Sequence, residues 1–306
     1  MILVVGSVAY DNLETPAGKR DNVLGGAAVH FSTAASFFSQ VAMVGVVGPD
    51  FEDQHITFLR SRGIDTSGIV VNPQGKTFRW SGHYLNDINH AETLATELGV
   101  FASFEPKLSS DHAQTSHLFL ANIHPRIQAS VLDQMPVVKF VAMDTMNYWI
   151  TTAREDLQKV IKRVDAIFVN DMEAKMLTHQ KNVMNAAAEI MNWGPKVVII
   201  KRGEHGALLF TKDFVFSAPG MPLGLIVDPT GAGDSFAGGF MGYLARSGNG
   251  SEEHLRRAAV FGSVMASFQV QDFGLDRMRT LTTADIEQRL KQFKTLSDFS
   301  GHAVFG

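Results

Sequence analysis

The sequence contains no cysteine among its 306 residues. Disulfide bridges and thiolate metal sites are therefore excluded, and the composition suits a reducing compartment. No stretch approaches the roughly 20 consecutive apolar residues that span a bilayer, so we expect no membrane partner. The opening apolar run, residues 1–6, lacks a basic leader, which predicts a buried first strand and not a signal peptide. We expect a cytoplasmic protein.

The chain also lacks a strong excess of charge of either sign. Its formal net charge is -4, and basic and acidic residues are interspersed along the whole length. Such a surface offers no basic footprint for a phosphate backbone, so we do not expect nucleic acid as a partner. The 11 histidines are scattered, and none forms a His-x-x-x-His pair beside a glutamate, which argues against a zinc site.

Two common nucleotide-binding motifs are missing. The sequence has no Gly-x-x-x-x-Gly-Lys-Ser/Thr, and residues 6–11 read Gly-Ser-Val-Ala-Tyr-Asp where a dinucleotide-binding protein would carry Gly-x-Gly-x-x-Gly. P-loop enzymes and ordinary NAD-dependent dehydrogenases are therefore disfavoured.

The hydrophobic residues, 45% of the chain, suffice for a substantial core. Short apolar runs alternate with longer segments of helical period, which predicts an α/β fold with a mostly parallel central sheet and helices on both faces. The candidate central strands are 41–47, 118–121, 140–142, 166–169 and 197–201. The candidate helices are 27–38, 126–134, 154–164, 173–178 and 183–193.

Residues 77–101 break this alternation, because Phe78, Trp80, His83 and Tyr84 are mixed with polar residues. We expect a small β element outside the main sheet, which would be either a lid over the carboxyl ends of the strands or a decoration without function. No internal repeat, low-complexity tract or linker divides the chain. The sequence thus predicts a single domain, 1–306, with an inserted lid.

The segment Asp-Pro-Thr-Gly-Ala-Gly-Asp, residues 228–234, follows a candidate strand at 225–227 and precedes a segment of helical period. Glycines at a helix start leave backbone N–H groups unobstructed, and the helix dipole favours negative charge there. This predicts an anion hole with Asp234 as an ionised base beside it. A plain helix N-cap after a turn is the alternative that spacing leaves open. Further glycines inside the helix indicate close packing against the sheet or a ligand: Gly238, Gly239 and Gly242.

Residues 228–236 resemble the second signature of the ribokinase-like, or PfkB-type, carbohydrate kinases, Asp-x-x-Gly-Ala-Gly-Asp-x-Phe, without a departure. Six further stretches resemble landmarks of that family in the same order: 6–11, 25–26, 44–50, 62–65, 170–173 and 202–207. The resemblance covers nearly the whole chain. It implies a three-layer ribokinase-like fold with a small β lid from about 11–22 and 77–101, and ATP-dependent phosphorylation of a hydroxyl group.

The resemblance implies roles at the phosphoryl-transfer end. Asp234 would be the base that activates the accepting hydroxyl. The amides that would hold the γ-phosphoryl group belong to Gly231, Ala232 and Gly233. Asp228 and Thr230 resemble positions that hold a monovalent cation in some members, which makes activation by K⁺ a hypothesis.

At the nucleotide end, Asn170 and Glu173 would arrange Mg²⁺ with its waters and the phosphates of ATP. A helix N-cap followed by an exposed first-turn acid is the structural alternative for this pair. The residues that the resemblance places along ATP are Lys201, Gly203 and Gly206, and residues 258–274 would wall the adenine.

Asp11 and the Gly25-Gly26 pair resemble the substrate end, where a carboxylate accepts hydrogen bonds from hydroxyls and the diglycine hinges a lid. From the residues alone, Asp11 is as well explained as a turn residue. His30 stands where many members carry asparagine, and its single donor and single acceptor predict a different set of accepted hydroxyls. Residues 144–147 lack the arginine of the family's Asp-x-Asn-x-Arg stretch, which argues against a phosphorylated substrate.

The leading interpretation is an ATP-dependent kinase for a small neutral sugar such as ribose. A ribonucleoside kinase is the alternative, since the lid aromatics Phe78, Trp80 and Tyr84 would stack on a base as well as cover a sugar or pack the lid on itself. A non-catalytic sugar or nucleotide sensor is disfavoured, because residues 231–234 are intact. An exposed edge of the lid sheet would allow a homodimer.

Overall fold

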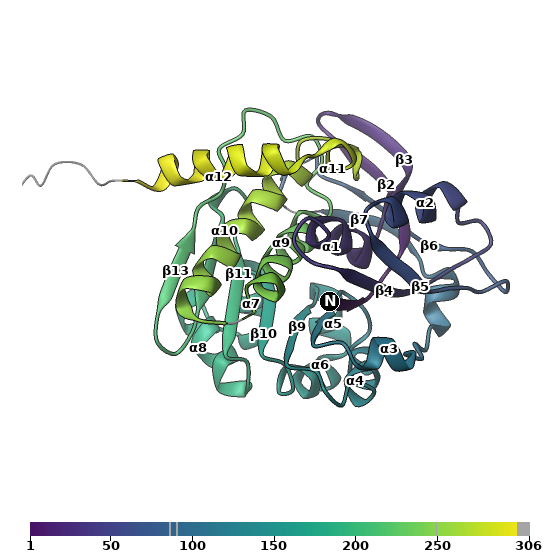
Figure 1. The fold of residues 1–306 in the computed structure, drawn as a ribbon, viewed down its shortest axis with the longest axis horizontal. Helices are drawn as coiled ribbons and strands as arrows, with labels where there is room; N and C mark the ends of the chain where they lie inside the picture. Colours follow the sequence, from purple (N-terminus) through teal and green to yellow (C-terminus); the bar gives the residue numbers. More distant parts are fainter. Residues whose placement is uncertain (86, 90, 249, 299–306) are drawn as a thin grey trace, which may run out of the picture.

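The computed structural model describes residues 1–85, 87–89, 91–248 and 250–298 (Figure 1). In these residues the main sheet has 9 strands in the order β13-β12-β11-β10-β9-β8-β1-β4-β5. Neighbours are parallel except for β11 with β12 and β12 with β13 at one edge, which confirms the mostly parallel sheet. The strands are β1 (Ile2–Val5), β4 (Val41–Val47), β5 (Ile64–Val71), β8 (His117–Leu120), β9 (Phe140–Asp144), β10 (Ala166–Asn170), β11 (Val197–Lys201), β12 (Ala207–Phe210) and β13 (Val215–Ala218).

Side chains of each central strand alternate between two hydrophobic cores, because successive residues of a strand point to opposite faces. On β1, Ile2 and Val4 belong to one core, and Leu3 and Val5 belong to the other. The first core is covered by α1 (Ala27–Ala35), α2 (Asp53–Ser61), α9 (Ala232–Ser247), α10 (Glu252–Gln269), α11 (Asp276–Thr280) and α12 (Thr283–Ser297). The second is covered by α4 (Pro125–Asp133), α5 (Asn147–Thr152), α6 (Arg154–Ile161), α7 (Asp171–Thr178) and α8 (Val183–Trp193). The three-layer arrangement is confirmed.

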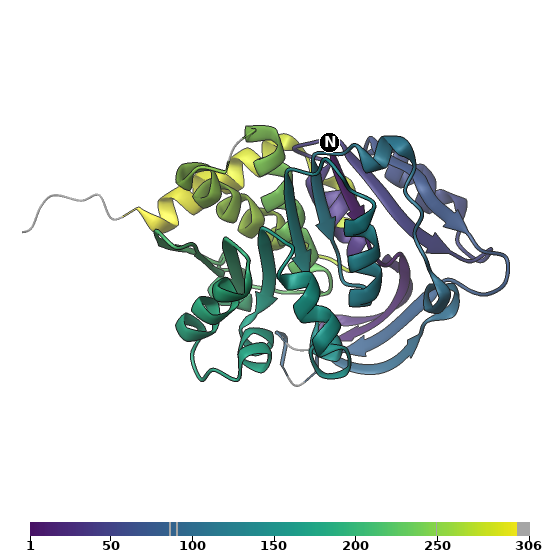
Figure 2. The same ribbon diagram turned by 90° about the horizontal axis from the view of Figure 1, so that it is seen from below.

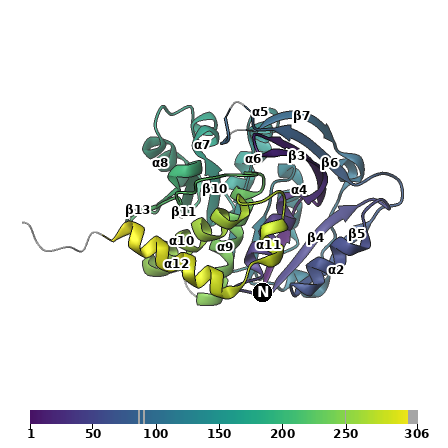
Figure 3. The same ribbon diagram turned by 90° about the horizontal axis from the view of Figure 1, so that it is seen from above.

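Two helices of the first face show how these layers are packed. All nine residues of α1 are buried, because the helix lies between the sheet and α9 and consists mostly of small side chains. The outermost helix, α12, lies against α10 and away from the sheet (Figure 3). This helix begins with a capping box: the Thr282 side chain accepts a hydrogen bond from the Asp285 N–H, and the Asp285 side chain accepts one from the Thr282 N–H.

A second sheet of four strands has the order β3-β2-β6-β7. Its strands are β2 (Ala9–Thr15), β3 (Gly18–Gly25), β6 (Phe78–His83) and β7 (Glu92–Glu97), which confirms the expected small β element. Figure 2 shows this sheet curving across the end of the main sheet that is opposite the start of β1, where the parallel strands end. Residues 86 and 90 of the expected lid lie outside the described residues.

The predicted strand at 225–227 is wrong. This segment has no strand structure, and Leu225 is 66% exposed. It leads from β13, at the edge of the main sheet, to the start of α9, so it has no strand beside it to pair with. It is held instead by two hydrogen bonds at Val227: the N–H donates to the Val270 carbonyl at 2.8 Å, and the carbonyl accepts from Thr15 Oγ1 of β2 at 2.8 Å.

The remaining short elements are α3 (Ser110–Ala113) before β8, and the 3-10 turns η1 (Gly99–Ser103) and η2 (Gly203–His205). Among the described residues, none of the helices combines the length and the apolar character needed to cross a membrane.

Candidate active site

Polar side chains converge where the parallel strands of the main sheet end. Asp144 is the last residue of β9, Asn170 of β10 and Lys201 of β11. Asp234 lies in the first turn of α9, opposite these strand ends. Ligands of open α/β sheets bind at the carboxyl ends of the strands, so the topology alone marks this edge as the candidate site.

The predicted helix start at the glycine segment is confirmed. Gly231 is the N-cap of α9 with a left-handed φ of 73°, which a side chain would strain. The amide of Ala232 donates to the Pro229 carbonyl at 3.1 Å, so it already closes a turn. The Ala232 amide is one of the three that were expected to hold the γ-phosphoryl group. To do so it would have to share its proton between the phosphoryl group and the Pro229 carbonyl, or give up the bond to that carbonyl.

A buried ion pair lies beside this helix start. The Lys201 ammonium contacts the Asp144 carboxylate at 2.7 Å. A β-carbon added to Gly233 would lie 2.9 Å from the Lys201 nitrogen, so the positive charge sits directly over the first turn of α9. The helix dipole and this ammonium together favour an anion at the same point. The sequence did not predict Asp144 as a site residue. Its stretch, 144–147, was interpreted only through the absence of the family's arginine.

Two carboxyl groups around this ion pair have pKa values moved towards neutrality. Burial raises the pKa of Asp234 to about 7, with a further rise from the charge of Asp144 and an opposing effect from Lys201. Burial likewise raises the pKa of Glu173 to about 7, against the lowering effect of Lys201. A carboxylate with such a pKa is well matched to general base catalysis at neutral pH.

Asn170 and Glu173 form a capping box at the start of α7. The Asn170 N–H donates to Glu173 Oε2 and the Glu173 N–H to Asn170 Oδ1, both at 2.7 Å. The N-cap interpretation therefore holds, but Glu173 is buried and not an exposed acid. Its second carboxyl oxygen lies outside the capping box and suits a hydrogen bond from a water of a hydrated Mg²⁺. Within the described chain, no three histidine or acidic side chains are grouped so as to hold a metal ion among themselves.

Asp11 and the diglycine come together at the substrate end. Asp11 is buried in β2, and a β-carbon on its neighbour Gly25 would lie 1.9 Å from the Asp11 carboxylate. Only glycine therefore lets β3 pass this close. Burial raises the pKa of Asp11 to about 8, the charges of Asp228 and Asp234 add to the rise, and the Gly26 amide opposes it. A hydroxyl donor from a ligand would stabilise the ionised form of this carboxylate.

His30 of α1 lies against the start of α9, which was expected to hold phosphate. It is 1% exposed, and a β-carbon on Gly231 would lie 2.3 Å from its ring. No hydrogen bond of good geometry reaches either ring nitrogen from the described residues, and the nearby Gln269 side chain acts on the ring by opposing the fall of its pKa. Burial lowers the pKa of His30 to about 4, so the ring is neutral at physiological pH. His30 thus lies between the substrate end and the phosphoryl-transfer end.

Tyr84 connects the small sheet to the glycine segment. It follows β6, and its backbone N–H donates to the Glu14 carbonyl of β2 at 2.9 Å. Its hydroxyl accepts a hydrogen bond from Thr230 Oγ1 at 3.1 Å. Burial raises the pKa of this phenol, and Asp228 adds to the rise, so it stays protonated and keeps its own proton to donate. The sequence left open whether this ring stacks on a base, covers a sugar or packs within the lid, and it gave no sign of the hydrogen bond.

The two glycines expected along ATP lie at the start of the turn η2 and directly after it, with different surroundings. A β-carbon on Gly203 would lie 2.1 Å from the Asn89 side chain, which belongs to the connection between β6 and β7. Gly206 instead backs onto the main chain of Ala218 and Gly220, and this contact explains it structurally. The small sheet with the connection between β6 and β7 therefore reaches from Asp11 to the turn at Gly203.

The residues of the expected cation site also come together, but their oxygen atoms are engaged. Asp228 is fully buried, and its two carboxylate oxygens accept hydrogen bonds from the backbone amides of Thr230 and Gly274. In this arrangement a monovalent cation would have to compete with these two amides for the Asp228 carboxylate.

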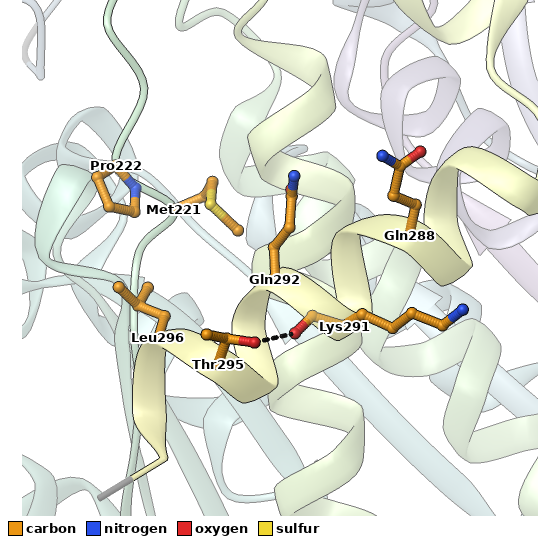
Figure 4. A pocket seen from close by; sticks show the side chains of 7 residues that line it. All are labelled: Met221, Pro222, Gln288, Lys291, Gln292, Thr295 and Leu296. Atoms are coloured by element: carbon orange, nitrogen blue, oxygen red, sulfur yellow. Dashed lines mark hydrogen bonds between the residues drawn. The ribbon is translucent and has the colours of Figure 1, made fainter.

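A separate hollow of about 430 Å³ lies between α12 and the segment after β13 (Figure 4). None of the predicted site residues lines it. Its lining residues are Met221, Pro222, Gln288, Lys291, Gln292, Thr295 and Leu296. Apolar ends of Met221, Pro222 and Leu296 gather on one side of it, and no convergent set of charges marks it as a site for chemistry (Figure 4).

Comparison with known proteins identifies relatives over nearly the whole chain. The model of the pfkB family of carbohydrate kinases matches residues 2–280. A cytidine kinase of Thermococcus kodakarensis is 33% identical over 262 residues, which are 83% of this chain and 92% of the relative. A nucleoside kinase of Methanothermobacter thermautotrophicus is 26% identical over 290 residues, 89% of this chain and 90% of the relative.

Comparison of the fold with solved structures leads to the same family. A double mutant of the fructokinase from Vibrio cholerae, in a form bound to fructose, ADP and potassium ion, matches with a TM-score of 0.76 and 17% identity. The match covers 94% of this chain and 97% of that chain, which confirms the ribokinase-like fold. The chain therefore belongs to the pfkB family of carbohydrate kinases, and it is a phosphotransferase that acts on an alcohol group of a nucleoside or a sugar.

Proposed function

We propose that the chain transfers the γ-phosphoryl group of ATP to a hydroxyl of a ribonucleoside. The similarity to the cytidine kinase across 83% of the chain carries this proposal, because it spans both the phosphoryl-transfer end and the lid. It reverses the order of the two interpretations that the sequence suggested, in which a neutral sugar came first.

The inner face of the small sheet supports a nucleoside acceptor. Asp11 of β2 and Trp80 of β6 are register partners, so their side chains leave the sheet on the same face. The carboxylate would accept hydrogen bonds from ribose hydroxyls, and the indole would stack on a base. The same carboxylate would bind the hydroxyls of a free sugar, which makes a neutral sugar such as ribose the second candidate.

Asp234 is the proposed general base. It would take the proton of the attacking hydroxyl, and its pKa of about 7 leaves much of it ionised at neutral pH. The start of α9 and the Lys201 ammonium would stabilise the charge that develops on the transferred group. Asp144, 2.7 Å from that ammonium, would hold Lys201 in place as a positioning residue.

ATP would enter with Mg²⁺, which neutralises charge on the phosphates when it is bound. Glu173 and Asp144 would accept hydrogen bonds from the waters of that ion. Asn170 would orient Glu173 through the capping box, and Gly203 and the adjoining turn would lie along the phosphates.

A panel of nucleosides and sugars, each tested with MgATP, checks the proposal. Release of ADP is followed, and the phosphorylated product is identified by mass spectrometry. We expect phosphorylation of one or more ribonucleosides at a higher kcat/KM than that of ribose or fructose. Turnover confined to free sugars would contradict the proposal and support the second candidate.

The variants Trp80→Ala and Trp80→Phe sharpen this test. If the indole stacks on a base, Trp80→Ala should raise the KM for a nucleoside by roughly tenfold, a loss typical of one base–aromatic stack, while Trp80→Phe keeps much of the affinity. The KM for ATP should stay unchanged in both variants. Leu296→Ala, on the distant helix α12, is the control.

A further inference from the structure

Two loops meet beneath the anion hole of α9. One carries Asp228 and Thr230 before the helix, and the other, residues 270–274, follows α10. The carbonyl oxygens of Thr230 and Gly274 face a common point, where one donor group contacts both. Convergent carbonyls of this kind, next to a buried carboxylate, are the ligands that a hard cation prefers.

The donor at that point is the side-chain amide of Gln269, the last residue of α10. Its Nε2 donates to the Thr230 carbonyl at 3.0 Å and to the Gly274 carbonyl at 2.5 Å. Its Oε1 accepts from Ser235 Oγ, in the first turn of α9, at 3.3 Å. The side chain is completely buried.

These partners also fix which way the amide points. Reversing it would set Oε1 against two carbonyl oxygens, which have no proton to share. The observed orientation uses both N–H bonds and the oxygen, so every polar atom of the buried amide has a partner. Three chain segments, around residues 230, 235 and 274, are thereby tied together through one side chain.

The carboxylate of Asp228 completes the arrangement without an ion. Its Oδ1 accepts from the Thr230 amide at 2.9 Å and its Oδ2 from the Gly274 amide at 2.8 Å. The neighbouring His30 ring is neutral and brings no positive charge. Hydrogen bonds from within the chain therefore engage both oxygens of the carboxylate, and the Gln269 amide lies where a cation between the two carbonyls would have to sit.

We propose that the Gln269 amide takes the place of a monovalent cation in this kinase, so that phosphoryl transfer proceeds without K⁺. The amide joins the two loops and holds the start of α9 in position for the phosphoryl group. This reverses the hypothesis of K⁺ activation that Asp228 and Thr230 suggested in the sequence.

The first experiment compares the unaltered protein in KCl and in tetramethylammonium chloride at equal ionic strength. With MgATP and the acceptor found in the substrate panel, turnover should differ by less than about twofold between the two salts. Activation by K⁺ of about tenfold or more would overturn the proposal.

Thermal unfolding of the same protein provides a readout without any substrate, so its result stands whether or not the acceptor is a nucleoside. The melting temperature should be equal in the two salts, because the Gln269 amide already occupies the point between the Thr230 and Gly274 carbonyls where K⁺ would bind. A rise that is specific to KCl would show that the ion binds and would overturn the proposal.

Substitution of Gln269 tests the role of the amide itself. Gln269→Ala should lose roughly tenfold in turnover in tetramethylammonium chloride, equivalent to two ordinary hydrogen bonds, and regain part of it in KCl as the ion enters the opened site. Gln269→Met fills the space without donors and should lose turnover in both salts. Gln288→Ala on α12 is the control and should match the unaltered protein. Unchanged turnover of Gln269→Ala in tetramethylammonium chloride would also overturn the proposal.

Discussion

At the scale of single residues, the site depends on one buried ammonium group, that of Lys201, which interacts with three carboxyl groups. Lys201 contacts Asp144 at 2.7 Å and also lowers the pKa values of Asp234 and Glu173. Burial has the opposite effect on both carboxyl groups and outweighs it, so each titrates near pH 7. As the proposed base, Asp234 would be strong enough to accept a proton and still partly ionised at neutral pH.

The activity should therefore fall on the acid side of neutrality. Asp234 must be ionised to act as a base, and its pKa is raised to about 7, so kcat/KM should decline about tenfold per pH unit below that value and level off above it. In Asp144→Asn the negative charge that raises this pKa is lost and Lys201 is released, and both changes move the decline to lower pH. A pH profile of kcat/KM checks this.

One control variant and one variant of the proposed base complete this test. Asp156→Asn removes a partly exposed carboxylate that pairs with Arg126 and Lys159, and its profile should match that of the unaltered protein. Asp234→Asn should lose at least roughly 10² to 10⁴ in turnover at every pH while it still binds ATP. Near-normal turnover of Asp234→Asn, or an unmoved profile in Asp144→Asn, would contradict the assignment of the base.

At the scale of secondary-structure elements, the glycines inside α9 serve helix packing. Gly238 and Gly242 lie against α1, and Gly239 lies against α10. The sequence had suggested the sheet or a ligand as their neighbour. This packing holds the start of α9, with Asp234, in a fixed position relative to His30 of α1.

Gly238→Ala should destabilise the protein. The added β-carbon would lie 2.3 Å from the Phe31 carbonyl oxygen and 2.9 Å from the Ala34 β-carbon, and α1 is enclosed on all sides. We expect a loss of about 1–3 kcal/mol in the free energy of unfolding, larger than the gain of about 1 kcal/mol in helix propensity. Urea denaturation measures it. Gly224→Ala, with no atom within 4 Å, should leave the midpoint unchanged. Equal urea midpoints for Gly238→Ala and Gly224→Ala would contradict the prediction and would show that α1 and α9 can move apart at little cost.

At the scale of the whole molecule, the small sheet joins the two ends of the site. Its strands carry Asp11 at the substrate end, Tyr84 contacts Thr230, and Asn89 lies beside Gly203 on the nucleotide side. We propose that the small sheet acts as a lid, and these contacts are the support for it. A lid so placed would exclude water from the transferred group only when both of its contacts are made.

The outer edge of this lid predicts a homodimer. Every residue of β7 is exposed, Leu94 by 61%, and among the described strands β7 pairs only with β6. An open strand edge that carries an exposed leucine favours pairing with a second copy. Light scattering should show a dimer, and Leu94→Lys should shift it towards the monomer, whereas Leu296→Lys on α12 should not. A monomer at all concentrations would refute the prediction.

The sequence by itself determined the elements whose signals are local. Strands 41–47 and 197–201 and helix 183–193 were predicted with the bounds that the structure shows, because continuous apolar runs and helical periods lie within the segments themselves. The start of α9 was predicted for the same reason, since the glycines and Asp234 are adjacent in the chain. The strand at 225–227 failed, because a short apolar run forms a strand only where a partner lies beside it.

Only the tertiary structure decided how distant residues share their charges and hydrogen bonds. The Lys201–Asp144 pair spans 57 residues, and the contact of Thr230 with Tyr84 spans 146. The bond from Gln269 to the Thr230 carbonyl joins residues 39 apart and changes the interpretation of Asp228 and Thr230 as a cation site. Such contacts depend on how helices and sheets pack, and a pattern of neighbouring residues carries no record of them.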